Sequence, residues 1–509
     1  MRSNMGEEQA RSRRNLFILI VLCVYLLLSL FMFDPKPFTG GDNAVYVLLA
    51  ESIAQGKGYK DLYLPDEQPH SQYPFGFPLL LTPFVLIFGI NIPLLKFVVL
   101  LSGLGALYFM TKICETLFKG KIYFLIALYT SIPIMITFNH WILTEMPFIC
   151  LSLASIYLLI KAETGKQYFY YLAFLCSIYA VFIRTAGIAL IVGIIVWLLL
   201  HKRYKQMVII IILFLLVFIP WQMRNAGIER GGGYVEQLLA RNPYQMELGR
   251  INILDFMRRI ADNFLYYAFR VLPSILLPVL QSEVLLTIVG AILTILTFIG
   301  FITRINRRSV FETYFVFAIM VLLAWPYVWA SDRFLLPVLP IFVIYIYSGV
   351  LWIRDKTNFR HLVPAFAGVI IALNIIVIVP LVRQTLEYNA AYLKGDRYAG
   401  YGLDWRRYFE IVEWTRKYIP YGNVIMARKP EFVYLLSRHK SIIYPFTTDH
   451  APIRDAIEKC DYIILDNFFW TATSAFYLFP VIEETPEKYT ILKKTGSPEF
   501  YLLKIESDS

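Results

Sequence analysis

The feature that most constrains this chain is a series of long apolar runs separated by short basic segments. Several runs approach the roughly 20 apolar residues that a helix needs to cross a bilayer core of about 30 Å. Of the 509 residues, 58% are hydrophobic and 17% are charged, and the mean hydropathy is +0.57. This apolar share exceeds that of soluble domains. We therefore predict an α-helical multi-pass membrane protein.

The net charge of +11 indicates membrane topology rather than nucleic-acid binding. The basic residues lie between apolar runs instead of covering one soluble face. Arg11, Arg13 and Arg14 lie just before the first run, which places the N-terminus in the cytoplasm. No small-residue cleavage site follows that run, so we expect it to be a retained anchor. The cysteines are too scattered to predict a disulfide framework. They are Cys23, Cys114, Cys150, Cys176 and Cys460.

The apolar runs and basic turns together predict about eleven spans. The run at 74–90 is interrupted by Pro78 and Pro83, and we expect it to dip into the interface without crossing. Arg184 divides the run at 168–200, which is too long for one span, into an out-and-back pair. The predicted spans are 16–33, 92–118, 122–138, 146–160, the two halves of 168–200, 207–221, 284–302, 311–329, 334–352 and 362–381.

From about residue 383 the composition changes to that of a small soluble domain. Its pattern alternates buried strands with helices, which predicts an α/β fold, and it carries no glycine-rich phosphate-binding fingerprint. The expected strands are 423–427, 441–444 and 462–465, the expected helices are 431–438 and 452–460, and a hairpin is expected from 489–494 and 499–505. We predict a membrane domain at 1–382 and an extracytoplasmic α/β domain at 383–509, because an odd number of spans leaves the tail outside.

The notable polar residues gather on the predicted external side. Asp42 follows two glycines just after the first span, and Glu145 lies where an external helix begins. A carboxylate beside a bilayer can act as general base on a substrate held there. Both residues also suit a structural role, since aspartate is a favoured N-cap and acidic residues are stabilised in the first turn of a helix. The sequence leaves both interpretations open.

Three arginines lie at external edges of the predicted membrane domain, where basic residues are otherwise depleted. They are Arg184, Arg224 and Arg333. The guanidinium group binds phosphate through two parallel hydrogen bonds, so the set predicts a site for a lipid-linked phosphate. Arg184 could instead snorkel to the surface, and Arg333 could pair locally with Asp332.

Five motifs, in this order, resemble the bacterial and archaeal branch of the GT-C glycosyltransferases, and more narrowly the protein mannosyltransferase and aminoarabinose transferase group. The motifs are Gly-Gly-Asp at 40–42, Tyr-Pro-Phe-Gly-Phe-Pro at 73–78, Thr-Glu-Met-Pro at 144–147, Pro-Trp-Gln-Met-Arg-Asn at 220–225 and Asp-Arg-Phe-Leu-Leu-Pro-Val-Leu-Pro at 332–340. The resemblance covers about 15–382. It implies transfer of a sugar, hexosyl or pentosyl, from a polyprenyl-phosphate carrier to a lipid, glycan or protein acceptor on the extracytoplasmic face of the cell membrane.

By this resemblance Asp42 takes the position of the catalytic aspartate, and Glu145 lies near the second acidic position of the family. Tyr46, Tyr73 and His70 are the predicted substrate-binding residues beside them. Single displacement by an acceptor whose proton passes to a carboxylate inverts the anomeric centre, so we expect inversion.

No cofactor is inferred from the sequence. The histidines His70 and His140 are too isolated to argue for zinc, and a divalent metal has no other support. The expected partners are the lipid-linked donor, membrane lipids and the acceptor. A transporter or flippase for lipid-linked glycans, or a ligase or polymerase acting on them, remains the alternative, although the two halves show no convincing repeat.

Overall fold

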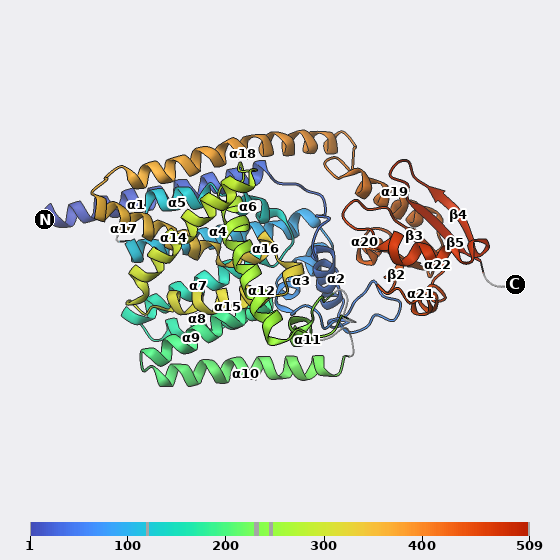
Figure 1. Cartoon of the computed structure of the whole chain (residues 1–509), viewed down its shortest axis with the longest axis horizontal. Coiled ribbons are helices and arrows are strands. Elements are labelled where there is room, and N and C mark those ends of the chain that lie inside the picture. The colour runs from blue at the N-terminus through green and yellow to red at the C-terminus, as the bar shows by residue number, and fades with distance from the viewer. Residues whose placement is uncertain (1, 119–121, 229–233, 244–247, 507–509) are drawn as a thin grey trace. The chain divides into compact units, whose positions relative to one another are not determined.

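The chain is described from a computed structural model over residues 2–118, 122–228, 234–243 and 248–506 (Figure 1). It divides into two compact units. The membrane unit comprises Met1–Pro35, Ser71–Phe77 and Pro93–Leu386, and the α/β unit comprises Lys36–His70, Pro78–Ile92 and Glu387–Ser509. The tail thus packs with two segments from the N-terminal part of the chain. The predicted domain boundary at 382/383, which leaves those segments in the membrane domain, stays a prediction.

Apolar helices build the membrane unit and confirm a multi-pass membrane protein. They are α1 (Arg2–Phe31), α4 (Ile92–Phe118), α5 (Tyr123–Thr130), α6 (Pro133–Thr137), α7 (Glu145–Thr164), α8 (Tyr168–Ile183), α9 (Ile188–Leu200), α10 (Tyr204–Ala226), α14 (Glu283–Ile305), α15 (Val310–Ala324), α16 (Asp332–Leu335), α17 (Leu339–Thr357) and α18 (Leu362–Leu393). Within the described residues, seven helical segments are long and apolar enough to cross a membrane, or eight if the bent pair at 123–140 counts as one. The helices α8, α9 and α15 lie at predicted spans but are shorter, so the count of eleven stays a prediction.

Close helix packing in this unit depends on glycines. A Cβ atom at Gly300 of α14 would lie 1.9 Å from the carbonyl oxygen of Tyr345, and one at Gly349 of α17 would lie 2.3 Å from that of Leu296. Small residues let two apolar helices approach until their backbones touch, which is how helices associate where hydrophobic burial gives no advantage. The α14–α17 pair is therefore fixed by these two positions.

The stretch between α10 and α14 contains α11 (Tyr234–Leu239), α12 (Ile253–Tyr266), a π-helical turn and α13 (Leu272–Leu276). Helix α12 begins with a capping box between Asn252 and Asp255. Asn263 on its inner face donates to the carbonyl oxygens of Leu323 and Trp325 at 2.8 and 2.7 Å. This stretch is thereby tied to the end of α15.

The α/β unit is built on a five-stranded sheet with the order β2-β1-β3-β5-β4. Its strands are β1 (Val424–Met426), β2 (Lys440–Ile442), β3 (Tyr462–Leu465), β4 (Tyr489–Lys494) and β5 (Tyr501–Ile505). Strand β1 is parallel to β2 and β3, while β5 is antiparallel to β3 and β4. The parallel strands and the hairpin confirm the α/β pattern predicted for the tail.

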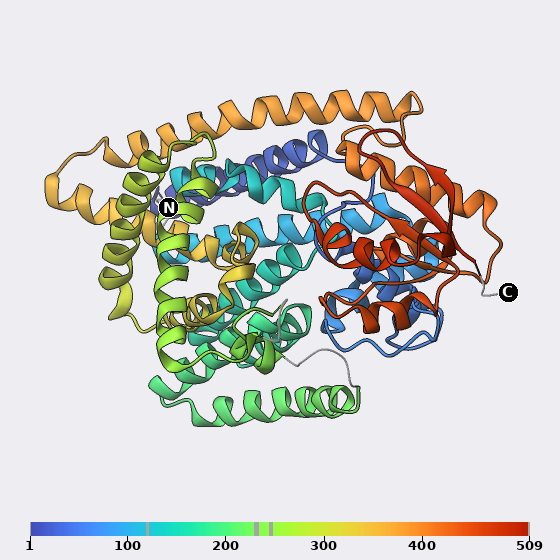
Figure 2. The ribbon, with the colours of Figure 1, turned by 45° about the vertical axis from the view of Figure 1, so that its right-hand side comes forward.

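Helices cover both faces of this sheet (Figure 2). On β1, Ile425 belongs to the core formed with α19 (Leu403–Tyr418) and α20 (Pro430–Ser437), whereas Met426 belongs to the core formed with α21 (His450–Ile457) and α22 (Phe479–Glu483). Successive side chains of a strand point to opposite faces, so β1, β3 and β5 each contribute to both cores. Helices α20 and α21 confirm predicted helices; α19 was missed.

The N-terminal segments of the α/β unit carry two short helices. Helix α2 (Asn43–Ala54) packs on α20, and its Ala44 lies in the same core as Phe432 and Val433. Helix α3 (Gly76–Phe88) has 13 residues and includes Pro83. It is among the shorter apolar helices, which is consistent with the predicted dip into the interface.

Candidate functional site

Two of the predicted arginines converge on Glu145 inside the membrane unit. Arg184 donates from Nη1 to Glu145 Oε1 at 2.6 Å, and Arg333 Nε donates to the same oxygen. Glu145 is fully buried, whereas the side chains of Arg184 and Arg333 retain 12% and 23% exposure. Two guanidinium groups thus face one carboxylate from elements 39 and 188 residues away along the chain.

Local backbone structure explains how these side chains meet. Glu145 is the first residue of α7, and Thr144 before it makes no capping bond but accepts from Arg184 Nη1 at 3.2 Å. Arg184 has an extended backbone between α8 and the turn that leads into α9, which confirms that it divides the long apolar run. Arg333 lies in α16, and its side chain binds Glu145 rather than serving only as a local partner for Asp332.

The second oxygen of Glu145 is left open by this arrangement. Glu145 Oε2 is buried and has no hydrogen-bond partner among the described residues. A buried carboxylate oxygen without a donor is costly, so such an atom is expected to receive one from a bound molecule. The site can therefore accept a hydrogen bond from a substrate group while both arginines stay in place.

Arg224 is connected to this region through aromatic rings. Its guanidinium group lies 5.0 Å from the ring centroid of Trp221 and donates to Asn225 at 2.8 Å. Trp221 contacts Phe75 edge to face at 5.1 Å, and Phe75 stacks on Phe182 at 4.8 Å. Phe182 precedes Arg184 by two residues, so Arg224 is connected to the Glu145 cluster through three rings.

An apolar cavity of about 310 Å³ opens beside Arg184. Its walls come from α7, α9, α11, α15 and the 334–338 segment, and include Phe148, Tyr314 and Trp325. Among the described residues that line it, Arg184 is the one charged side chain. The cavity suits a molecule that is largely apolar and carries a negative group at one end.

Asp42 lies in the α/β unit, at the N-cap position of α2. Its backbone angles are not those of a typical cap, and its side chain makes no capping hydrogen bond to the helix. Asn43, the next residue, instead donates to the carbonyl oxygen of Gly40 at 2.7 Å, and Gly41 has a φ of +64° that favours glycine. The carboxylate of Asp42 is thus held at a tight turn without serving as the cap.

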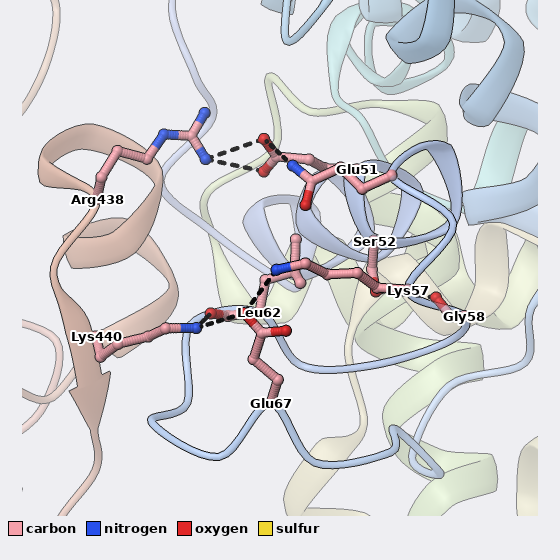
Figure 3. Close-up of polar contacts among 9 residues, drawn as sticks. Glu51, Ser52, Lys57, Gly58, Leu62, Glu67, Arg438 and Lys440 are labelled. Atoms are coloured by element: carbon pink, nitrogen blue, oxygen red, sulfur yellow. Dashed lines mark hydrogen bonds and ion pairs between the residues drawn. The ribbon is translucent and has the colours of Figure 1, made fainter.

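The helix that begins after Asp42 is fastened to the tail by an ion network (Figure 3). Arg438, at the end of α20, donates to both carboxylate oxygens of Glu51. Lys440 of β2 donates to the carbonyl oxygen of Leu62 at 2.7 Å and to Glu67 at 2.8 Å, and Lys57 also binds Glu67 at 2.8 Å. These two lysines hold the pKa of Glu67 below its ordinary value.

Backbone bonds complete the attachment of segment 36–70. Ser441 N donates to the carbonyl oxygen of Tyr63 at 2.7 Å, and Tyr401 donates from its hydroxyl to the carbonyl oxygen of Pro37 at 2.6 Å. The segment that carries Asp42 is therefore held at both ends and in its helix by residues 401–441.

The predicted substrate-binding residues are distributed over both units. Tyr46 is buried in α2, and His70 is buried with Nδ1 2.8 Å from Asp61 Oδ1. Both belong to the α/β unit, while half-buried Tyr73 belongs to the membrane unit. The binding roles of these residues stay predictions. Within the described residues, no group of three or more His, Cys, Asp and Glu side chains could hold a metal ion.

The sequence predicted the charged residues of the site but not which residues contact one another. Phe75 and Trp221 belong to the motifs at 73–78 and 220–225, yet their stacking between Arg224 and Phe182 depends on tertiary structure. Glu51 and Arg438 were not noticed at all. Glu51 could have been singled out from the sequence, because it is an acidic residue within an otherwise apolar helix at 43–54 and an isolated charge there needs a partner.

The chain is similar in fold to solved glycosyltransferase structures. It matches ArnT from Cupriavidus metallidurans, solved with undecaprenyl phosphate bound, with a TM-score of 0.57 and 10% identity over 96% of this chain and 97% of that one. The Archaeoglobus fulgidus oligosaccharyltransferase, solved with zinc and sulfate, gives a TM-score of 0.56 and 14% identity over 96% and 73%. The oligosaccharyltransferase AglB from Archaeoglobus fulgidus, solved with an inhibitory peptide and a dolichol-phosphate, gives 0.56 and 13% over 95% and 74%.

At the level of sequence alone, no protein-family model and no curated protein matches the chain. The structural likeness nevertheless extends over nearly the whole chain, membrane unit and tail together. Such a likeness at low identity establishes the fold, and it agrees with the family that the five motifs resemble. The chain therefore has the fold of the GT-C glycosyltransferases.

Proposed function

We propose that this protein is an integral-membrane glycosyltransferase that moves a sugar from a polyprenyl-phosphate carrier to an acceptor on the extracytoplasmic face. The observation that carries the proposal is the cluster of Glu145, Arg184 and Arg333, of which Arg184 lines an apolar cavity. The guanidinium group of Arg184 can thus meet a phosphate at the edge of space suited to an isoprenoid chain. The related folds solved with undecaprenyl phosphate and with a dolichol-phosphate support this choice of carrier.

The reaction follows from the residue types. An acceptor hydroxyl or amine attacks the anomeric carbon, the bond from that carbon to the phosphate oxygen breaks, and polyprenyl phosphate leaves as a stable anion. Arg184 and Arg333 stabilise the charge that develops on the departing phosphate, with Arg224 as a further phosphate contact. Asp42 takes the proton of the acceptor as general base. One displacement inverts the anomeric centre.

Glu145 has two tasks in this scheme. Through Oε1 it orients both arginines, and through the unpartnered Oε2 it accepts a hydrogen bond from the bound substrate. Tyr46, Tyr73 and His70 complete the substrate site on this proposal. The acceptor is a lipid, glycan or protein of the cell envelope.

The carrier is tested with the full-length protein in lipid nanodiscs. We expect undecaprenyl phosphate to bind, as detected by native mass spectrometry, and a panel of undecaprenyl-phosphate sugars to be consumed with release of undecaprenyl phosphate when membrane acceptors are added. A flippase would move the donor across the bilayer without cleaving it. Intact donor after prolonged incubation, with the carrier bound, would contradict the transferase assignment.

The predicted topology places the N-terminus and basic turns in the cytoplasm and the tail outside. In intact cells, an impermeant thiol reagent should label a Lys394→Cys variant but not Lys202→Cys or Arg307→Cys. Labelling at 202 or 307 would reverse the assigned side.

A further inference from the structure

The tail carries a second candidate site, at the carboxyl ends of its three parallel strands. Arg428 follows β1 by two residues, Tyr444 follows β2 by two residues, and Asp466 follows β3 directly. Carboxyl ends of parallel strands meet at one edge of a sheet, and ligands of open α/β folds bind in the crevice beyond this edge.

The strand order puts a topological switch point at this edge. From β1 the chain runs through α20 to β2 on one side, and from β2 it returns through α21 to β3 on the other side of β1. Helices α20 and α21 belong to cores on opposite faces of the sheet. The crevice therefore lies between the ends of β1 and β3, where Arg428 and Asp466 are located.

A hydrogen-bond network fixes these side chains. Tyr444 Oη lies 2.7 Å from Ser474 Oγ and 3.0 Å from Thr473 Oγ1. Arg428 Nε donates to Thr473 Oγ1 at 2.9 Å, and Ser474 donates to Asp466. Asp466 and Ser474 are both buried, so a carboxyl group and a hydroxyl group are preorganised beneath the surface of the loop at 466–475.

This loop borders an open pocket of about 310 Å³, at the lower end of the range for small-molecule sites. Asp466, Asn467, Thr471 and Ser474 supply polar groups to its lining, while Phe469 and Trp470 supply rings that are 70% and 46% exposed. The indole of Trp470 is held against Phe468 at 5.3 Å and lies below the guanidinium of Arg428 at 5.1 Å. The indole of Trp470 is therefore a fixed aromatic surface beside the polar groups of the lining.

We propose that this pocket binds a saccharide, with a sugar ring against the aromatic surface of Phe469 and Trp470 and its hydroxyl groups paired with Asp466 and Asn467. Sugars present apolar C–H faces and vicinal hydroxyls, and this lining matches both. A phosphate is disfavoured, because Asp466 repels it and Arg428 is already bonded to Thr473 and packed on aromatic rings. The pocket is distinct from the proposed transfer site, and binding requires no donor.

The test uses the full-length protein in a detergent without a sugar headgroup, applied to an array of defined oligosaccharides of mannose, galactose, glucose and N-acetylglucosamine. The strongest binder is then titrated by calorimetry. We expect Trp470→Ala to weaken binding about tenfold or more, and Asp466→Asn, which can still accept from Ser474, to weaken it as well. Tyr421→Ala, an exposed aromatic elsewhere in the unit, is the matched control and should bind like the parent.

Thermal melts of each variant separate loss of binding from loss of folding. The proposal is overturned if no saccharide binds, or if Trp470→Ala, still folded, binds as tightly as the control. Competition by inorganic phosphate at concentrations comparable to the saccharide would replace it with an anion site. None of these outcomes depends on sugar transfer, so the proposed glycosyltransferase activity stands or falls separately.

Discussion

Arg438 donates from a single guanidinium nitrogen to both carboxylate oxygens of Glu51, at 3.1 and 2.9 Å, across 387 residues of sequence. This ion pair joins the end of α20 to the helix that follows Asp42. Asp42 therefore precedes a helix that is tied to the tail.

The first prediction is that breaking this pair loosens α2. Arg438→Ala should raise hydrogen exchange in 43–54 and lower turnover, at a cost in global stability of about 1 kcal/mol or less because the arginine is partly exposed. Arg438→Lys should restore part of both properties. Arg416→Ala, an exposed arginine on α19, is the control. Unchanged exchange in α2 would show that the pair does not position it.

The second prediction concerns Asp42. Asp42→Asn keeps the shape of the side chain and removes its basicity, so turnover should fall about 10²–10⁴-fold while the protein stays folded and still binds lipid carrier. Transfer within a few-fold of the parent, measured with a lipid-linked donor, would leave Asp42 with a structural role.

The third prediction separates charge from geometry at the arginines. Arg184→Lys and Arg333→Lys keep the positive charge but lose the planar fork, so the KM for the lipid-linked donor should rise by roughly tenfold or more. Arg224→Lys should have a smaller effect because the guanidinium of Arg224 lies over the ring of Trp221, a contact that a lysine can also make. The exposed Arg258→Lys is the control. Donor dependence equal to the parent in all three variants would remove the phosphate role.

The fourth prediction is that Glu145 stabilises the membrane unit as well as the substrate. Glu145→Gln leaves two arginines facing a neutral group, and breaking a buried ion pair in this way costs roughly 3–5 kcal/mol. We expect a clear drop in Tm of the detergent-solubilised protein. Glu163→Gln, an exposed glutamate near the other end of α7, should melt like the parent.

The fifth prediction is a pH dependence in the α/β unit. Burial raises the pKa of Asp466 to about 6 from an ordinary value of 3.8, with the Ser474 hydrogen bond and the charge of Arg428 partly opposing the shift. The folded state therefore binds a proton that the unfolded state releases between these values, and its contribution to stability is present below about pH 4 and lost as pH rises through 6.

Asp466→Asn removes this titration. The difference in Tm between variant and parent should accordingly shift in favour of the variant from pH 4 to pH 7, measured by fluorescence of the full-length protein. Asp455→Asn, an exposed aspartate on α21, serves as the comparison. A difference in Tm that is constant with pH would assign Asp466 its ordinary pKa.

Much of the fold could be predicted because it rests on local patterns. The apolar runs predicted the membrane helices, and Arg184 predicted the break between α8 and α9, since one charge inside an apolar run must lie at a helix end or in a polar site. Strand and turn patterns likewise predicted β1, β3 and the β4–β5 hairpin. Helix α19 was missed although its apolar residues recur with helical spacing at Trp405, Tyr408 and Val412.

The pairings in the candidate site could not be predicted, because they join distant elements. Nothing near Glu145 in sequence indicates Arg333, which lies 188 residues away. Likewise, Glu51 belongs to an apolar helix beside predicted spans, and its contact with Arg438 together with packing on α20 assigns that helix to the α/β unit. A single sequence reports which residue types are present, whereas these pairs depend on how the helices pack.

Because 36–70 and 387–509 belong to one compact unit, this unit can be completed only after the tail has been synthesised. At synthesis rates of roughly 5–20 residues per second, the tail leaves the ribosome on the order of tens of seconds after α2. During that interval Arg438 and Lys440 have not yet been synthesised, so their ion pairs with Glu51 and Glu67 cannot form. The segment that carries the proposed catalytic aspartate thus acquires these contacts only after residues 438–440 have been synthesised, so a chain interrupted before them lacks this attachment.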